Sequence, residues 1–120
     1  MSKPASLAGK KILVLEDEPF IATDMEEALA NVGATVTLCA AATEALEIVA
    51  SIPVDCGILD INVTDGTCYK VADRLRMQGT PFVFTTAYEQ VRGDFADVPI
   101  FRKPFDHETL LRMVARMTAP

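Results

Sequence analysis

The fold is decided by one stretch near the middle of the chain, residues 54–62, which reads Val54-Asp55-Cys56-Gly57-Ile58-Leu59-Asp60-Ile61-Asn62. Its apolar residues Ile58 and Leu59 lead directly to a carboxylate, Asp60, where a loop is expected to begin. A short run that is apolar on both faces is typical of a buried strand in a parallel sheet. We therefore expect Asp60 to lie at the carboxyl end of a central strand.

Strands and helices are predicted to alternate five times along the chain. The predicted strands cover residues 11–15, 34–39, 56–59, 81–84 and 100–101. Apolar residues at spacings of three and four indicate helices between them, with Pro19 at one helix start and Gly33 at its end. Residues 87–98 predict only a short or irregular helix, and residues 61–66 a loop without a hairpin. Such alternation implies an α/β fold with a parallel sheet, helices on both faces and right-handed crossovers.

Length and composition limit the protein to one compact domain over residues 1–120, with residues 1–10 as a polar lead-in. The formal net charge of −6 argues against a direct nucleic-acid partner, which would need a basic face. Neither a signal peptide nor a membrane span is expected, which predicts a cytoplasmic protein. The three cysteines are far apart and lie in apolar or mixed segments, so we expect reduced core residues.

Polar side chains follow four of the predicted strands. Glu16 and Asp17 follow the first, Asp60 the third, Thr86 the fourth and Lys103 the fifth. In open parallel sheets, functional groups gather outside the carboxyl ends of the strands, so these five residues are expected to meet. Three close carboxylates repel one another, and a hard divalent cation such as Mg2+ would relieve the repulsion. Because a carboxylate can attack phosphorus, we interpret Asp60 as a phosphoryl acceptor, with Thr86 and Lys103 neutralising phosphoryl charge.

Each residue alone also has a simpler interpretation. Glu16 and Asp17 could be helix caps, Thr86 a turn residue and Lys103 a solvated charge. The single histidine, His107, is expected at a solvated position in the first turn of the last helix. Only the combination, with every member at the correct strand end, points to a site.

These motifs resemble the receiver domains of two-component response regulators, from about residue 11 to residue 117. The motifs are Leu15-Glu16-Asp17-Glu18-Pro19, Leu59-Asp60-Ile61-Asn62, Thr85-Thr86-Ala87 and Arg102-Lys103-Pro104-Phe105. The resemblance implies a flavodoxin-like three-layer (βα)5 fold with a parallel five-stranded sheet of order 2-1-3-4-5. It also implies a sensor histidine kinase or a phosphotransfer protein as the phosphoryl donor.

The resemblance further assigns roles to individual residues. Asp17, Asp60 and the backbone carbonyl of Asn62 would ligate Mg2+ or Mn2+, with Glu16 acting through water. Thr86 and Lys103 would contact the phosphoryl group on Asp60, and the bond from Lys103 to Pro104 would be cis.

Three features depart from the usual receiver pattern. Ile100 stands where many receivers have an aromatic residue that swings inward, so any such switch would need Phe101 or Tyr88. Thr64 stands where a proline is common, and residues 87–102 are short for a full helix and strand, so the usual dimer is not assumed. Asn62 and Tyr88 flank the expected route of water to the phosphorylated aspartate, and Tyr88 is expected to shield it.

The leading hypothesis is a stand-alone receiver that signals by binding a downstream protein in one state, or that acts as a phosphate sink. It would be no enzyme beyond its own phosphorylation and dephosphorylation. One alternative is an aspartyl-phosphate phosphohydrolase, although such enzymes usually carry a second aspartate where this chain has Asn62. The other is a receiver-like scaffold that no longer takes phosphate, whose signature would be a lost acid or lysine.

Overall fold

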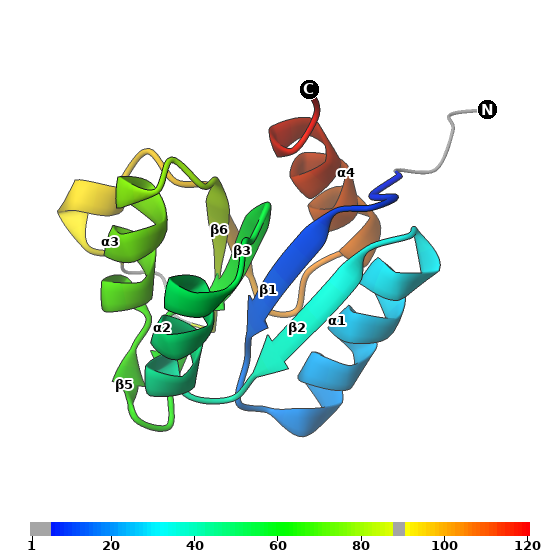
Figure 1. The fold of residues 1–120 in the computed structure, drawn as a ribbon. Helices are drawn as coiled ribbons and strands as arrows, with labels where there is room; N and C mark the ends of the chain where they lie inside the picture. The colour runs from blue at the N-terminus through cyan, green and yellow to red at the C-terminus, as the bar shows by residue number, and fades with distance from the viewer. Residues whose placement is uncertain (1–5, 88–90) are drawn as a thin grey trace.

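The computed structural model describes residues 6–87 and 91–120, which are built around a sheet of five parallel strands (Figure 1). The strands are β1 (Lys11–Leu15), β2 (Thr35–Cys39), β3 (Cys56–Asp60), β6 (Phe82–Thr86) and β7 (Ile100–Arg102). Their order is β2-β1-β3-β6-β7. Since β4 and β5 form a separate small sheet, this is the predicted order 2-1-3-4-5, and the flavodoxin-like fold is confirmed.

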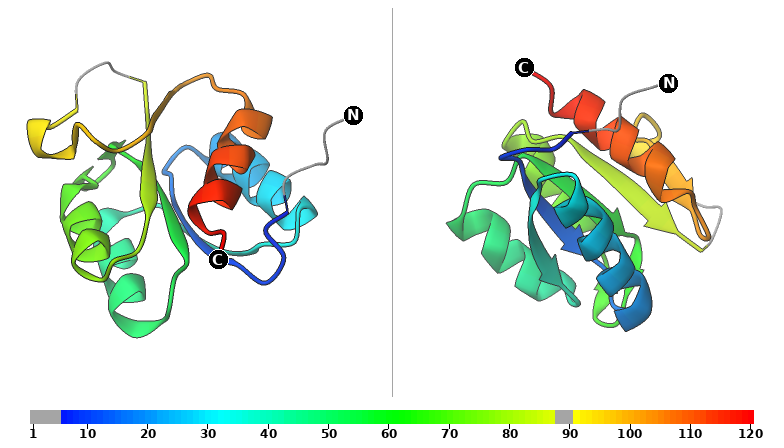
Figure 2. Two further views of the ribbon diagram at one scale, coloured as in Figure 1. Left: turned by 90° about the horizontal axis from the view of Figure 1, so that it is seen from above. Right: turned by 90° about the vertical axis from the view of Figure 1, so that its right-hand side faces the viewer.

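Within residues 6–87 and 91–120, four α-helices cover the two faces of the sheet (Figure 2). They are α1 (Pro19–Asn31), α2 (Ala42–Ser51), α3 (Tyr69–Met77) and α4 (His107–Met117). Side chains of a strand point alternately to opposite faces. In β1, Ile12 and Val14 pack in the core beneath α1 and α4, whereas Leu13 and Leu15 pack in the core beneath α2 and α3. The described residues thus form two hydrophobic cores, one on each face of the sheet.

The ends of α1 follow the predicted signals. Pro19 occupies its first turn, and the side chain of Glu18 accepts a hydrogen bond from the backbone N–H of Ile21 at 2.8 Å. At the other end Gly33 has a φ of +98°, and a Cβ there would lie 2.9 Å from the Cα of Ala8. Glycine is therefore required at this helix end both by backbone conformation and by space.

The prediction of a polar lead-in over residues 1–10 is wrong for Leu7. Its side chain is 0% exposed and belongs to the core beneath α1 and α4. Its backbone N–H also donates to the carbonyl of Val32 at 2.8 Å. A single leucine among polar residues shows no periodicity, so the sequence pattern contains nothing that marks it as buried.

The loop after β3 contains a hairpin that was not expected. The strands β4 (Asn62–Val63) and β5 (Gly66–Thr67) pair antiparallel across a turn formed by Thr64 and Asp65. Two-residue strands are too short to show the alternation by which strands are predicted. This hairpin places the turn next to the end of β1, which becomes important for the acids there.

Residues 91–99, which precede β7, are irregular, as predicted. Within residues 91–99 the only helix is η1 (Gly93–Phe95), a single 3-10 turn. Phe95 is buried and stacks on Tyr69 of α3 with ring centroids 5.6 Å apart. The guanidinium of Arg92 lies 4.7 Å from the centre of the Tyr69 ring, and its backbone N–H donates to the Tyr69 hydroxyl. Aromatic and cation–π contacts therefore hold this segment against α3.

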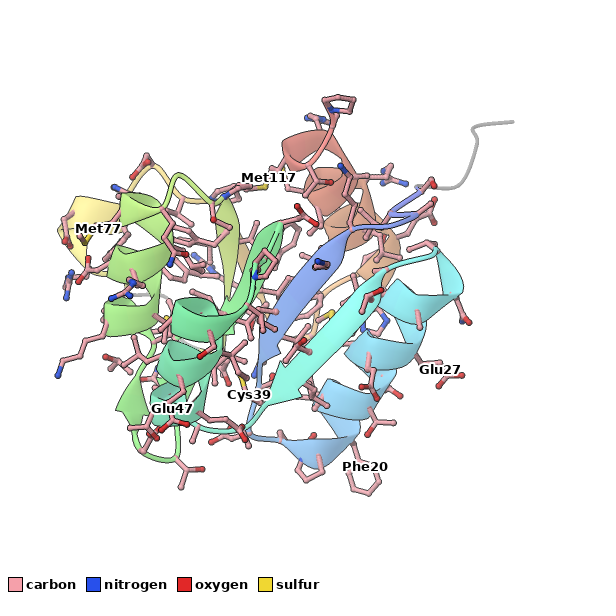
Figure 3. The ribbon with its side chains drawn as sticks, in the orientation of Figure 1. Phe20, Glu27, Cys39, Glu47, Met77 and Met117 are labelled. Atoms are coloured by element: carbon pink, nitrogen blue, oxygen red, sulfur yellow. The ribbon has the colours of Figure 1, made fainter. Side chains whose placement is uncertain are left out.

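The three cysteines are buried and unpaired, which confirms their interpretation as core residues. They are Cys39, Cys56 and Cys68, and Figure 3 shows Cys39 at the end of β2. Burial raises the pKa of each thiol to about 12.

Within residues 6–87 and 91–120, none of the helices has the length and apolar character needed to cross a bilayer.

Gly57 in β3 is expected to tolerate no larger side chain. A Cβ at this position would lie 2.7 Å from Cδ1 of Leu75, which is fully buried, and 3.4 Å from Cβ of Phe82. Gly57→Ala should therefore lower the free energy of unfolding by about 1–3 kcal/mol, as overpacked cores do. Urea unfolding followed by far-ultraviolet circular dichroism measures the change. Gly93→Ala is the matched control, because open space surrounds that glycine; equal effects of the two substitutions would contradict the prediction.

Candidate functional site

The polar residues predicted to meet do lie together at the carboxyl edge of the sheet. Asp60 is the last residue of β3 and pairs in register with Thr85 of β6. The next residue, Thr86, pairs with Arg102, which places Lys103 directly beyond the sheet edge. The backbone N–H of Lys103 donates to the carbonyl of Thr86 at 2.8 Å. The parallel register thus brings together residues far apart in sequence.

Lys103 joins two of the carboxylates. Its Nζ lies 2.6 Å from Oε1 of Glu16 and 2.9 Å from Oδ2 of Asp60. Both acids are 5% exposed, so this ion pair is largely removed from water. The peptide bond from Lys103 to Pro104 is cis, as the motif implies.

The acid cluster perturbs the ionisation of Asp60. Burial raises the pKa of Asp60 to about 6, although the hydrogen bond from Lys103 opposes the shift and the charge of Glu16 adds to it. For Lys103, burial opposes the charged form, but hydrogen bonds to Glu16 and Asp60 outweigh burial and leave the pKa of Lys103 above its ordinary value. The single ammonium of Lys103 therefore offsets the effect of burial on Asp60 only in part, and the pKa of Asp60 stays above its ordinary value.

Asp17 is held differently from the other two acids. Its side chain is half-buried, and its Oδ2 accepts a hydrogen bond from the hydroxyl of Thr64 at 2.9 Å. Glu16, by contrast, uses Oε1 for Lys103 and Oε2 for the backbone N–H of Glu18 at 3.1 Å. Asp17 is thus the carboxylate of the cluster that no cation contacts within the described part of the chain.

The donor set fits a hard divalent cation. Glu16, Asp17 and Asp60 each offer a carboxylate oxygen, and these oxygens lie within 4.8 Å of one another. Lys103 supplies one positive charge against three negative ones. Oxygen ligands with excess negative charge are what Mg2+ prefers, usually with several waters retained. Asp17 has room for a direct contact, since only its Oδ2 accepts a hydrogen bond among the described residues. Asp60 could bind through Oδ1, whose contact with the N–H of Asn62 is long at 3.4 Å, whereas both oxygens of Glu16 have closer partners.

The remaining predicted site residues divide into three groups. Thr86 is fully buried at the site, and the backbone N–H of Asn62 donates to Oδ1 of Asp60 at 3.4 Å. Ile100, at the start of β7, is 39% exposed and pairs with Phe84 in the sheet. Tyr88 lies outside the described residues, so its shielding role stays a prediction.

Phe101 does not lie on the face of the sheet to which Thr86 belongs. It is half-buried in the core beneath α1 and α4, where its ring centroid lies 6.1 Å from that of Phe105. Phe84, two residues before Thr86, faces the opposite core beneath α2 and α3. Because alternate residues share a face, Phe101 and Thr86 lie on opposite sides of the sheet. Phe101 is therefore badly placed to replace the aromatic residue missing at Ile100.

The hairpin turn contributes two residues beyond those predicted: Thr64 contacts the acid cluster, and Asp65 anchors the turn. Thr64 contacts Asp17, as described. Asp65 accepts hydrogen bonds at its two carboxylate oxygens from the backbone N–H groups of Ala42 (2.8 Å) and Thr43 (3.1 Å), at the start of α2. The sequence does contain a signal for Thr64, because this residue stands where a proline is common. It contains none for Asp65, because a helix cap supplied by a distant loop produces no local sequence pattern.

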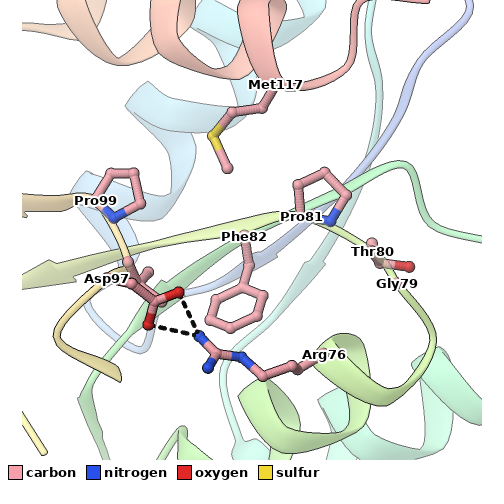
Figure 4. A pocket seen from close by; sticks show the side chains of 9 residues that line it. Arg76, Gly79, Thr80, Pro81, Phe82, Asp97, Pro99 and Met117 are labelled. Atoms are coloured by element: carbon pink, nitrogen blue, oxygen red, sulfur yellow. Dashed lines mark hydrogen bonds and ion pairs between the residues drawn. The ribbon is translucent and has the colours of Figure 1, made fainter. Parts of the chain in front are cut away.

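Several hollows open on the described part of the chain, one of them lined by Glu16 and Asp17, and two others lie on different sides of the molecule. One of about 420 Å³ lies beside the site, lined by Lys103, Pro104, Phe105, His107, Ile21 and Asp24. His107 is half-buried there, rather than solvated as expected. The other, of about 340 Å³, lies where β6 and β7 begin; Arg76 and Asp97 form an ion pair of 3.1 Å at its wall (Figure 4). Because it is at the opposite end of the strands, this second hollow is separate from the acids.

Comparison with known proteins agrees with this geometry. The family model of the response regulator receiver domain matches residues 12–115. The chain is 32% identical over 115 residues to the transcriptional regulatory protein DltR of Streptococcus agalactiae, covering 90% of this chain and 51% of DltR. It is 31% identical over 93 residues to the Regulator of RpoS of Escherichia coli, covering 76% of this chain and 27% of that protein. The chain thus spans about half the length of DltR.

A solved structure of similar fold carries a ligand relevant to the acids. The response regulator protein TrrA from Thermotoga maritima, solved in complex with Mg2+ and BeF, is 28% identical with a TM-score of 0.80. The similarity covers 90% of this chain and 98% of that one. Together with the sheet order, the paired acids and the lysine, a match over residues 12–115 establishes that this chain belongs to the response regulator receiver domains of two-component systems.

Proposed function

We propose that Asp60 accepts a phosphoryl group from a phosphohistidine of a sensor histidine kinase or a phosphotransfer protein, in the cytosol. The observation that carries the proposal is the ion pair of 2.9 Å between Asp60 and Lys103, in a cluster with Glu16 and Asp17 at the carboxyl edge of the sheet. A carboxylate held next to an ammonium has a neutralising group in place for the charge that arrives with phosphate.

The proposed transfer balances in atoms and charge. A carboxylate oxygen of Asp60 forms the bond to phosphorus while the bond from phosphorus to the histidine nitrogen breaks, and the electron pair returns to the imidazole. When the signal ends, water attacks phosphorus, the bond from phosphorus to the Asp60 oxygen breaks, inorganic phosphate leaves and the Asp60 carboxylate is restored. Lys103 would neutralise the phosphoryl oxygens, and Thr86 would contact them through its hydroxyl.

Mg2+, or Mn2+, is the proposed cofactor. The three acids fit it by ligand type, by the 4.8 Å clustering of their oxygens and by their excess negative charge. Asp17 and Asp60 would be direct ligands, with the backbone carbonyl of Asn62, and Glu16 would act through water. The cation would supply positive charge for the phosphoryl oxygens. Its ligands would be held in place by the protein contacts described for each acid.

The output is proposed to be state-dependent binding of another protein, or withdrawal of phosphate from a shared kinase. No catalysis on other substrates is proposed. The irregular segment 91–99 and the isoleucine at position 100 argue against transmission through the usual inward-swinging aromatic residue. A scaffold that takes no phosphate, and a phosphohydrolase, are the competing functions.

One experiment separates these functions. The protein is incubated with Mg2+ and a small-molecule phosphodonor, and its intact mass is measured, with Asp60→Ala as the control. An acid-stable, base-labile adduct of one phosphoryl group on the wild type but not on Asp60→Ala is the expected result. Absence of the adduct from the wild type would favour the scaffold, and turnover of unrelated phosphate esters would favour the phosphohydrolase.

A further inference from the structure

The hairpin of β4 and β5, which follows Asp60, is held in position by strand pairing, by a buried side chain and by hydrogen bonds from its turn. Asn62 pairs with Thr67, and Val63 pairs with Gly66. The side chain of Val63 is buried in the core beneath α2 and α3. The two residues of the turn, Thr64 and Asp65, are exposed but each makes side-chain hydrogen bonds to another element.

Asp65 fixes the turn on one side. Its carboxylate accepts hydrogen bonds from the backbone N–H of Ala42, the backbone N–H of Thr43 and the hydroxyl of Thr43, at 2.8, 3.1 and 3.0 Å. The N-cap position of α2 itself is Ala41, which has no side-chain acceptor. Asp65 therefore supplies from a distant loop the cap that α2 lacks, and these bonds lower the pKa of Asp65.

Thr64 contacts the metal-ligand candidate on the other side. Its hydroxyl donates to Oδ2 of Asp17 at 2.9 Å. In the described part of the chain this is the one hydrogen bond that the Asp17 carboxylate accepts. Lys103 does not contact Asp17, since its ammonium binds Glu16 and Asp60. Without Thr64, the Asp17 side chain would keep its rotamer freedom at the moment when a cation has to be bound.

We propose that Thr64 is a positioning residue for Asp17. By donating to Oδ2 it fixes the orientation of the carboxylate and leaves Oδ1 for a divalent cation. A carboxylate that binds a metal through one oxygen is commonly oriented by a hydrogen bond to the other, and loss of such a partner costs affinity. A proline at position 64 could not donate this bond, so the residue that departs from the usual pattern has its own function. This inference rests on the proposed binding of Mg2+.

The test compares Mg2+ affinity in matched variants by isothermal titration calorimetry, without any phosphodonor. Thr64→Val keeps the shape of the side chain and removes the donor, so its dissociation constant for Mg2+ should rise about tenfold. Thr64→Ser restores a hydroxyl and should bind nearly as the wild type does. Thr67→Val is the matched control, because Thr67 lies in the same hairpin and no hydrogen bond of its hydroxyl is recorded among the described residues.

The possible outcomes separate this inference from the proposed function. Unchanged affinity in Thr64→Val, tighter binding by it, or an equal loss in Thr64→Val and Thr67→Val would each overturn the role of Thr64 while leaving the proposed function intact. A wild type that binds no Mg2+ would overturn both. Equal thermal melting temperatures of the metal-free variants exclude a fold defect, and Thr64→Ala is the second variant should the valine disturb the turn.

Discussion

Asp60→Asn is expected to be more stable than the wild type in buffer free of divalent cations, by about 3 kcal/mol at pH 8 and by far less at pH 4. Burial raises the pKa of Asp60 from 3.8 to about 6. The folded state therefore holds the proton more tightly than the unfolded chain does. The protonated carboxyl contributes its full stabilisation below the pKa of the unfolded chain, and this contribution is lost as the pH rises through the pKa of the folded state. Asparagine does not ionise, so the variant keeps its stability over the same range.

Urea unfolding of both proteins from pH 4 to pH 8, with a chelator present, measures the difference in free energy of unfolding. The gap should open between about pH 4 and pH 6, where the folded and unfolded states differ in proton occupancy. Glu27→Gln is a suitable control, since Glu27 is exposed on α1 and points away from the sheet (Figure 3). A gap that stays constant over this range would contradict the assignment of the shift to Asp60.

This cost at Asp60 explains why the site was predictable from sequence. An acid at the end of a fully apolar strand is unfavourable for folding, so its presence there indicates a function. The parallel topology then fixes which other residues meet it, because only residues that follow strands reach the same edge. Glu16, Asp17, Thr86 and Lys103 satisfied that rule, and the structure places them there.

The residues that sequence analysis missed share a different physical cause. The burial of Leu7, the capping of α2 by Asp65 and the contact of Thr64 with Asp17 all depend on loops whose course is set by tertiary packing. Periodicity exists only within regular elements of several residues, and these contacts are made by single residues outside them. Local patterns therefore predict the strand ends well and the loops that complete the site poorly.

The contacts of residues 91–99 are a further case that local sequence patterns do not predict. Its composition excluded a long helix, but its packing partner could not be predicted. In the structure Arg92 and Phe95 use Tyr69 as a common surface, and Arg92 also lies 2.7 Å from Asp94. Tyr69 begins α3 directly after the hairpin that carries Thr64. The element next to the site and the segment that replaces the usual helix are thus joined through one tyrosine.

Lys103→Met is expected to impair both stability and phosphorylation. Removing the ammonium leaves Glu16 and Asp60 buried without a cation, and breaking such a pair typically costs about 3–5 kcal/mol. The loss should be largest at pH 8 and smaller near pH 5, because Asp60, whose pKa is raised to about 6, takes up a proton there and no longer repels Glu16. The rate of phosphorylation by a small phosphodonor in Mg2+ should fall about 100-fold or more, since one preorganised charge is missing.

The double variant Asp60→Asn/Lys103→Met distinguishes charge balance from simple packing. If charge balance dominates, removing one carboxylate together with the ammonium leaves Glu16 as the single buried acid of the trio, and part of the lost stability should return. If lost packing of the lysine stem dominates, Asp60→Asn should add to Lys103→Met only the gain of about 3 kcal/mol at pH 8 that it adds to the wild type, whereas charge balance predicts a larger gain. Lys70→Met on the exposed side of α3 is the control for removing a lysine charge. Wild-type stability at pH 8 in Lys103→Met, with a wild-type rate of phosphorylation, would contradict the assigned role of Lys103 altogether.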